Sequence, residues 1–170
     1  MFSSDTLLAA EDRLLTRARA TTGPSIDLAT VETITSKPDA EGRMLGPDQA
    51  AALASVAVSG RVVDVLVGPA GAGKTTAMNA LRRAWETEHG AGSVVGLAPS
   101  AVAAQVLADD LGIATENTAK WWTTHQHTGA TVQAGQLVII DEASLAGTLS
   151  LDRITQAAEE AGAKVLLVGD

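Results

Sequence analysis

The sequence predicts an α/β fold in which helices alternate with the strands of a parallel sheet, and three observations support this. Apolar segments of strand length recur at 62–67, 93–98, 137–140 and 164–168. Segments of helical length lie between them, at about 74–88, 100–111 and 150–161. Strands that alternate with helices in this way form parallel sheets through crossover connections. The third observation is a glycine-rich loop between the first strand and its helix, which is typical of phosphate binding.

The glycine-rich loop matches the complete pattern G-x-x-x-x-G-K-[ST]. It consists of Gly68, Pro69, Ala70, Gly71, Ala72, Gly73, Lys74 and Thr75, and Thr76 follows it. The backbone N–H groups of such a loop surround phosphates, and the N-terminus of the next helix adds a favourable dipole. Lys74 is expected to reach the β- and γ-phosphates, and the Thr75 hydroxyl to ligate Mg²⁺. We therefore predict a site for ATP and Mg²⁺, the alternative being a structural strand-to-helix turn.

A second motif follows the strand at 137–140, which ends in the adjacent carboxylates Asp141 and Glu142. Ligands bind at the carboxyl ends of the strands in sheets of this type. Asp141 is expected to hold Mg²⁺ directly or through water, and Glu142 to orient or deprotonate the water that attacks the γ-phosphate. Alone, two acidic residues after an apolar strand also fit an ordinary charged turn.

Composition limits the remaining possibilities. The 170 residues suffice for one domain with a core, and the 46% hydrophobic and 2% aromatic content predicts an aliphatic core of small side chains. The absence of Cys excludes disulfides and thiolate metal sites, and with no apparent signal peptide or membrane span it favours a cytoplasmic location. The net charge of −8 argues against a broadly basic surface for nucleic acid, so any contact with DNA is expected to be local.

The first 44 residues form a separate part in this interpretation. An amphipathic helix is expected at 5–20 and a short helix at 26–34, followed by a polar linker at 36–42. A further helix begins at Pro47, which suits the first helical position, and ends near Gly60. We expect a helical extension and linker at 1–44 and the nucleotide-binding domain at 45–170. Asp64, within the first apolar strand, has no explanation in the sequence.

Five motifs in order resemble those of superfamily 1 helicases of the RecD-like branch, and above all the helicase part of conjugative relaxases of the TraA/TraI (MobF) type. They are L-G-P-D-Q at 45–49 (Q motif), G-P-A-G-A-G-K-T-T at 68–76 (motif I), G-L-A-P-S at 96–100 (motif Ia), V-I-I-D-E-A-S at 138–144 (motif II) and V-L-L-V-G-D at 165–170 (start of motif III). The resemblance covers about 45–170.

This resemblance implies a RecA-like P-loop ATPase, the first motor domain of an ATP-dependent DNA helicase linked to conjugative transfer. It assigns adenine recognition to Gln49, catalytic roles to Lys74 and Glu142, and the γ-phosphate sensing region to Asp170. It also assigns contacts with single-stranded DNA to Pro99 and Ser100, although Ser100 equally suits a helix N-cap.

The resemblance further implies how the strands are ordered and what is missing. In related folds the strand at 164–168 lies between those at 62–67 and 137–140, with 93–98 beyond, so the loop-bearing strand becomes an unpaired edge. The family's motif III continues past Gly169-Asp170. We therefore expect a fragment that lacks the second RecA-like domain with its arginine fingers, and also the relaxase domain, and that does not unwind DNA alone.

Two other functions stay open at this point. The chain is alternatively a catalytically silent nucleotide-binding or interaction relic, or a stand-alone P-loop kinase for a small molecule. The kinase is disfavoured because D-E-A-S at 141–144 is a helicase feature and no lid-type Arg cluster is evident. Trp121 and Trp122, which follow Lys120, suggest base stacking, although neighbouring helical residues point differently and at least one should pack inward.

Overall fold

A parallel five-stranded sheet forms the centre of the molecule. The computed structural model describes residues 4–67, 72–129 and 131–169. The strands are β1 (Val63–Val67), β2 (Val94–Ala98), β3 (Ala114–Asn117), β4 (Leu137–Ile140) and β5 (Lys164–Gly169), in the order β1-β5-β4-β2-β3. The order of the four predicted strands is confirmed, with β5 between β1 and β4. The α/β fold class is confirmed as well.

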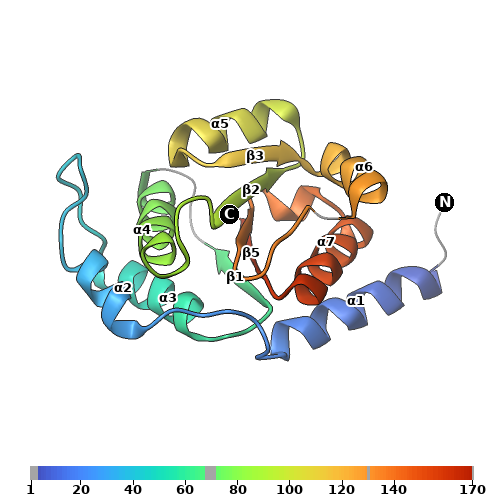
Figure 1. Cartoon of the computed structure of the whole chain (residues 1–170), viewed down its shortest axis with the longest axis horizontal. Coiled ribbons are helices and arrows are strands. Elements are labelled where there is room, and N and C mark those ends of the chain that lie inside the picture. The colour runs from blue at the N-terminus through green and yellow to red at the C-terminus, as the bar shows by residue number, and fades with distance from the viewer. Residues whose placement is uncertain (1–3, 68–71, 130, 170) are drawn as a thin grey trace.

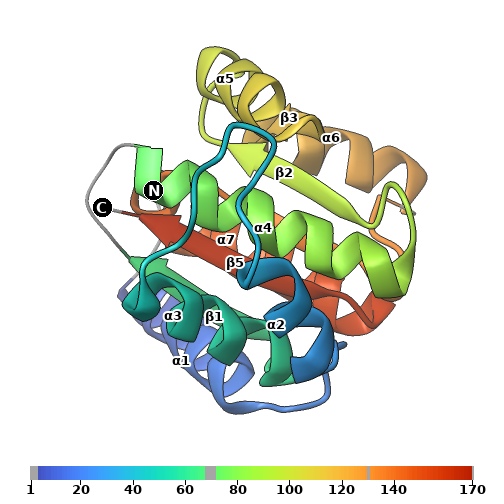
Figure 2. The same ribbon diagram turned by 90° about the vertical axis from the view of Figure 1, so that its left-hand side faces the viewer.

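Helices cover both faces of the sheet (Figure 1). One face carries α2 (Leu28–Thr35), α3 (Pro47–Val58), α4 (Ala72–His89) and α5 (Ala101–Leu111), of which α3 and α4 lie in front of the sheet in Figure 2. The other face carries α1 (Ser4–Arg19), α6 (Thr118–Thr128) and α7 (Thr148–Ala161). A short 3₁₀ helix, Ala143–Leu145, follows β4. Each face buries its own cluster of mainly aliphatic side chains, as the composition predicts.

Local sequence signals explain where two of the helices begin. Pro47 occupies the first turn of α3, and Gln49 accepts a hydrogen bond from the Gly46 N–H at 3.2 Å. Ser100 is the N-cap of α5, and its hydroxyl oxygen accepts a hydrogen bond from Ala103 N–H at 3.1 Å. Such bonds satisfy backbone donors that have no partner within the helix. The N-cap role expected of Ser100 is confirmed.

The two edges of the sheet differ from each other. At one edge, β3 pairs with β2 over four residues, a strand that the sequence analysis missed. Its sequence, A-T-E-N, lacks the apolar run or alternation by which strands are recognised. At the other edge, β1 pairs with β5 alone among the described strands, as expected. Val65 and Val67 on β1 are 57% and 66% exposed.

Asp64, which the sequence left unexplained, pairs with a buried lysine. Lys164, at the start of β5, is fully buried, and its Nζ lies 2.8 Å from Asp64 Oδ2. The same ammonium donates to Ser59 Oγ and to the Arg61 carbonyl oxygen, at 2.9 and 3.0 Å. Burial lowers the pKa of Lys164, an effect that the hydrogen bond and charge of Asp64 oppose. Asp64 therefore supplies the counter-charge for an ammonium that has no access to water.

The N-terminal helix is held on α7 by a second ion-pair cluster. Arg17 on α1 is buried and donates to Asp152 Oδ1 at 2.7 Å and to Thr155 Oγ1 at 3.0 Å. Arg13, one turn earlier, donates to Asp152 Oδ2 at 2.7 Å from Nη2. Two arginines of α1 thus share one carboxylate of α7. This contact fixes α1 against the face of the sheet that also carries α6.

Candidate nucleotide site

The carboxyl edge of the sheet brings together the predicted nucleotide-binding residues. β1, β5 and β4 are parallel neighbours, so the loop after β1 and the carboxylates after β4 emerge at the same edge with one strand between them. Val67 at the end of β1 pairs in register with Gly169 of β5, and Ile140 of β4 pairs with Leu167. This edge is where parallel α/β sheets bind their ligands.

The described part of the phosphate loop forms the first turn of α4, which begins at Ala72. Lys74 and Thr75 are partly exposed there, whereas Thr76 is buried. The predicted strand before the loop and the predicted helix after it are therefore present, with β1 ending at Val67. Gly68, Pro69, Ala70 and Gly71 lie outside the described residues, as does Asp170.

Gln49 lies directly against this first turn. A Cβ atom built on Gly73 would be 2.5 Å from Gln49 Nε2, closer than real Cβ contacts allow, so the Gln49 amide occupies space that only glycine leaves open. The other end of the amide, Oε1, accepts the hydrogen bond from Gly46 N–H. The Gln49 side chain is thus held at Gly46 and reaches the turn that carries Lys74. Sequence analysis assigned a role to Gln49 only through the family resemblance, because no local pattern indicates this contact.

Asp141 and Glu142 follow β4 with distinct backbone conformations. Asp141 N–H donates to the Leu97 carbonyl oxygen at 2.9 Å, which extends the pairing of β4 with β2, and Asp141 Oδ1 accepts a hydrogen bond from Glu142 N–H at 2.9 Å. Glu142 has a φ of 51°, the only positive φ among the described non-glycine residues. Left-handed backbone is costly for glutamate, and such outliers occur often at functional sites.

The side chains of these two residues differ in exposure. Asp141 is half-buried, whereas Glu142 is exposed at the edge of the sheet. Ala143, the next residue, is buried and starts the 3₁₀ helix. The turn therefore anchors Ala143 in the core and leaves the Glu142 carboxylate accessible to a ligand or to water.

The residues of motif Ia lie farther along the same edge. Pro99 and Ser100 follow β2, which is the neighbour of β4 on the side away from β1. Ser100 is exposed, although its hydroxyl oxygen already accepts the capping bond from Ala103. The edge therefore presents, in order of strands, the phosphate loop, the acidic pair and the motif Ia turn.

The donor set fits a magnesium nucleotide without forming a complete protein cage. No group of three or more His, Asp or Glu side chains suited to a metal occurs among the described residues. Mg²⁺ keeps several waters and commonly takes only one or two protein ligands plus phosphate oxygens. The Thr75 hydroxyl and the Asp141 carboxylate supply that kind of oxygen.

Residues 44–170 match a family described as AAA domain. The chain belongs to this family. The AAA domain is 39% identical over 127 residues to the conjugal transfer protein TraA of Rhizobium radiobacter. It is 36% identical over 127 residues to the probable conjugal transfer protein TraA of Sinorhizobium fredii. In each case the alignment covers 74% of this chain but only 11% of the relative. These relatives confirm the resemblance that the motifs indicated.

The fold of the AAA domain also occurs among solved structures. The UvsW helicase from bacteriophage T4 superposes with a TM-score of 0.58 at 16% identity, over 87% of this chain and 62% of that one. At this identity the likeness concerns the fold, and it agrees with the predicted P-loop, RecA-like architecture. Among the described residues, no helix of this AAA domain has the length and apolar character needed to cross a membrane.

Proposed function

We propose that this chain is the ATP-binding first motor domain of a DNA helicase that acts in conjugative transfer. Helicase-like motor character rests on the family, on the conjugal transfer relatives and on the fold. The observation that carries ATP binding is the contact of the Gln49 amide with the first turn of α4, which joins the Q motif to the phosphate loop. We further propose that residues 45–170 form this domain, that 1–44 are an extension to it, and that the protein is cytoplasmic.

The proposed roles follow from the position of each side chain. The backbone of the loop from Gly68 to Thr76 holds the phosphates, and Lys74 supplies a positive charge to them. Thr75 and Asp141 hold Mg²⁺, which when bound offsets the negative charge of the phosphates. Glu142 accepts a proton from the attacking water or orients it, because its carboxylate is exposed at the edge of the sheet. Gln49 hydrogen-bonds the adenine.

Single-stranded DNA is the proposed partner of the intact protein, with Pro99 and Ser100 on its path. A second RecA-like domain, from downstream polypeptide, completes the proposed motor. Arginine fingers in related NTPases contribute roughly 10³–10⁵ in rate. We therefore expect the 170-residue chain to bind ATP without robust turnover and without strand separation. Asp170 belongs to the γ-phosphate sensing region in this proposal.

An ATPase assay with and without single-stranded DNA, preceded by a binding measurement with Mg²⁺ and ATP, tests this function. Binding with slow turnover that DNA stimulates supports the motor domain. Binding with no turnover under any condition favours the silent relic. Turnover that depends on an added small phosphate acceptor and ignores DNA favours a kinase. Measurable unwinding of a tailed duplex by the purified chain would contradict the need for a second domain.

A further inference from the structure

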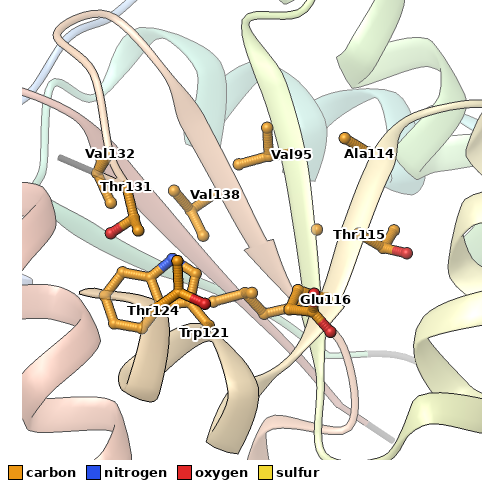
Figure 3. Close-up of a pocket in the computed structure, with 11 residues that line it drawn as sticks. Val95, Ala114, Thr115, Glu116, Trp121, Thr124, Thr131, Val132 and Val138 are labelled. Atoms are coloured by element: carbon orange, nitrogen blue, oxygen red, sulfur yellow. The ribbon is translucent and has the colours of Figure 1, made fainter. Parts of the chain in front are cut away.

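A cavity of about 240 Å³ lies on the sheet face that carries α6, away from the nucleotide site. Its walls are mainly aliphatic and come from β2, β4 and the segment before β4: Val95, Leu97, Val132 and Val138. Ala114 and Glu116 of β3 and Trp121 and Thr124 of α6 also line it (Figure 3), together with Gly96, Thr115 and Thr131. Leu97 belongs to motif Ia and Val138 to motif II, but neither is one of the predicted site residues.

The cavity is lined by a hydrogen-bond donor that has no acceptor among the described residues. Trp121 is only 7% exposed, and Figure 3 shows its indole nitrogen on the side of the ring that faces Val138 and Thr131. No acceptor for this N–H occurs in the described part of the chain, whereas the indole N–H of buried Trp85 donates to the Gly135 carbonyl oxygen at 2.9 Å. A donor that faces a cavity without a protein partner is available to a ligand that carries an acceptor.

The indole is held in a fixed orientation. The ring of His125 stacks on that of Trp121, with centroids 5.0 Å apart and planes inclined by 7°. His125 Nδ1 is in turn hydrogen-bonded to Thr131 Oγ1 at 2.8 Å. The donor of Trp121 is therefore set in place before any ligand arrives, which lowers the entropy cost of binding.

A carboxylate is the charged group of the cavity lining. Glu116 Oε1 accepts a hydrogen bond from Asn117 N–H at 3.0 Å, and Oε2 lies 3.6 Å from Lys120 Nζ. A carboxylate has about four lone-pair sites, so Glu116 retains capacity to accept further bonds. The lining thus combines apolar walls with a fixed donor and a carboxyl group that can accept hydrogen bonds.

We propose that this cavity binds a nucleobase. A base is a planar heterocycle whose edge offers an acceptor for the Trp121 N–H and a donor for the Glu116 carboxylate, while its faces suit the valine walls. An aliphatic side chain would leave the indole donor unpaired. Pockets for drug-sized ligands measure about 300–1,000 Å³, so a cavity of about 240 Å³ suits a single base rather than a whole nucleotide. The proposal does not rest on ATP binding at the phosphate loop.

Indole N–H resonances provide a direct test, because the chain has three Trp residues. The probes are the free nucleosides adenosine, guanosine, cytidine and thymidine, which lack the phosphates that the loop at 68–75 requires. Trp121→Phe removes one indole resonance and thereby assigns it. We expect at least one nucleoside to shift the Trp121 resonance saturably and to leave that of Trp85 unchanged. By calorimetry, Trp121→Phe should weaken binding by roughly tenfold, the loss of one hydrogen bond.

Two leucine variants distinguish the cavity from the surface around it. Ala114→Leu adds a side chain to the exposed cavity-lining position on edge strand β3 and should abolish the shift. Ala119→Leu adds the same side chain to an exposed position of α6 outside the cavity and should leave it intact. Circular dichroism confirms that each variant folds. Binding that persists in Ala114→Leu would overturn the proposal, and so would the absence of a shift with every base.

A second comparison identifies the source of the base. The probes are a short single-stranded oligonucleotide and an abasic strand of the same length. If the oligonucleotide shifts the Trp121 resonance at a lower concentration than the nucleosides do, and the abasic strand does not shift it, the cavity takes a base from a strand. Equal potency of nucleoside and oligonucleotide would show that it takes a free base. A strand that shifts the resonance equally with and without bases would contradict base recognition.

Discussion

The ammonium of Lys164 and the carboxylate of Asp64 form a buried ion pair at 2.8 Å between neighbouring strands β5 and β1. The pair lies at the end of the sheet opposite the nucleotide site, because Lys164 is the first residue of β5. It accounts for the only acidic residue within β1. A lysine with no exposure depends on such a partner, since an unpaired buried charge is strongly unfavourable.

We predict that Asp64→Ala lowers the free energy of unfolding by about 3–5 kcal/mol, the cost of breaking a buried ion pair. Urea unfolding measures the change. The control is Arg61→Ala, because Arg61 also bonds Asp64 but its side chain is 43% exposed. This second variant should cost no more than about 1 kcal/mol. Equal losses in the two variants would show that the burial of Lys164 is not what makes Asp64 important.

We predict that the cluster of Asp152 with Arg13 and Arg17 makes the free energy of unfolding fall at acidic pH. Burial raises the pKa of Asp152, but the hydrogen bonds and charges of the two arginines together outweigh it and leave the pKa below its ordinary value. Between the pKa of Asp152 in the folded chain and its higher pKa in the unfolded chain, the unfolded chain binds more protons than the folded chain. The contribution of Asp152 to the free energy of unfolding is therefore complete above about pH 5. It is lost as the pH falls through the pKa of Asp152 in the folded chain.

Asp152→Asn tests this dependence. Urea unfolding from about pH 6 to pH 3 should show a smaller loss of stability in the variant than in the parent, because the titrating carboxylate is gone. Asp12→Asn, at an exposed position of α1, the helix that carries Arg13 and Arg17, should follow the parent curve. Identical slopes for Asp152→Asn and the parent would contradict the assignment.

We predict that the amide nitrogen of Gln49 discriminates adenine. Gln49→Glu keeps an oxygen that can accept the bond from Gly46 N–H and so preserves the start of α3. It removes the donor beside Gly73, and affinity for ATP should fall by roughly tenfold, the equivalent of one hydrogen bond. Affinity for inorganic tripolyphosphate, which has no base, should fall only slightly. A similar loss for both ligands would show that Gln49 acts on the loop and not on adenine.

We predict that Asp141 and Glu142 have separable roles. Glu142→Gln should leave affinity for ATP with Mg²⁺ unchanged and lower residual hydrolysis by roughly 10²–10⁴-fold, the range for loss of a general base. Asp141→Asn should weaken binding only when Mg²⁺ is present. Calorimetry and a single-turnover assay measure the two effects. If Glu142→Gln weakened binding as much as Asp141→Asn, this division of roles would be wrong.

The sequence predicted those parts of the fold that short patterns encode. The order of four strands, the cap at Ser100 and the start of α3 at Pro47 all follow from local residues and from the motif series. Strand β3 was not predicted, because A-T-E-N is polar and short and forms a strand only by pairing with β2.

Contacts between distant residues were beyond prediction from the sequence alone. Asp64 and Lys164 are 100 positions apart, and Arg17 and Asp152 are 135 apart. Each pair depends on which elements lie side by side, which no local pattern specifies. For the same reason the sequence suggested base stacking by Trp121 but did not predict the cavity that its indole faces.

The most direct test of the nucleotide site is titration of the 170-residue chain with ATP and Mg²⁺ by calorimetry, before and after Lys74→Ala. Charge-assisted bonds to phosphate are lost in the variant, and affinity should fall at least about tenfold while circular dichroism stays unchanged. Lys120→Ala, at an exposed position of α6, is the matched control and should bind as the parent does. Equal affinity in Lys74→Ala and the parent chain would contradict nucleotide binding at the phosphate loop.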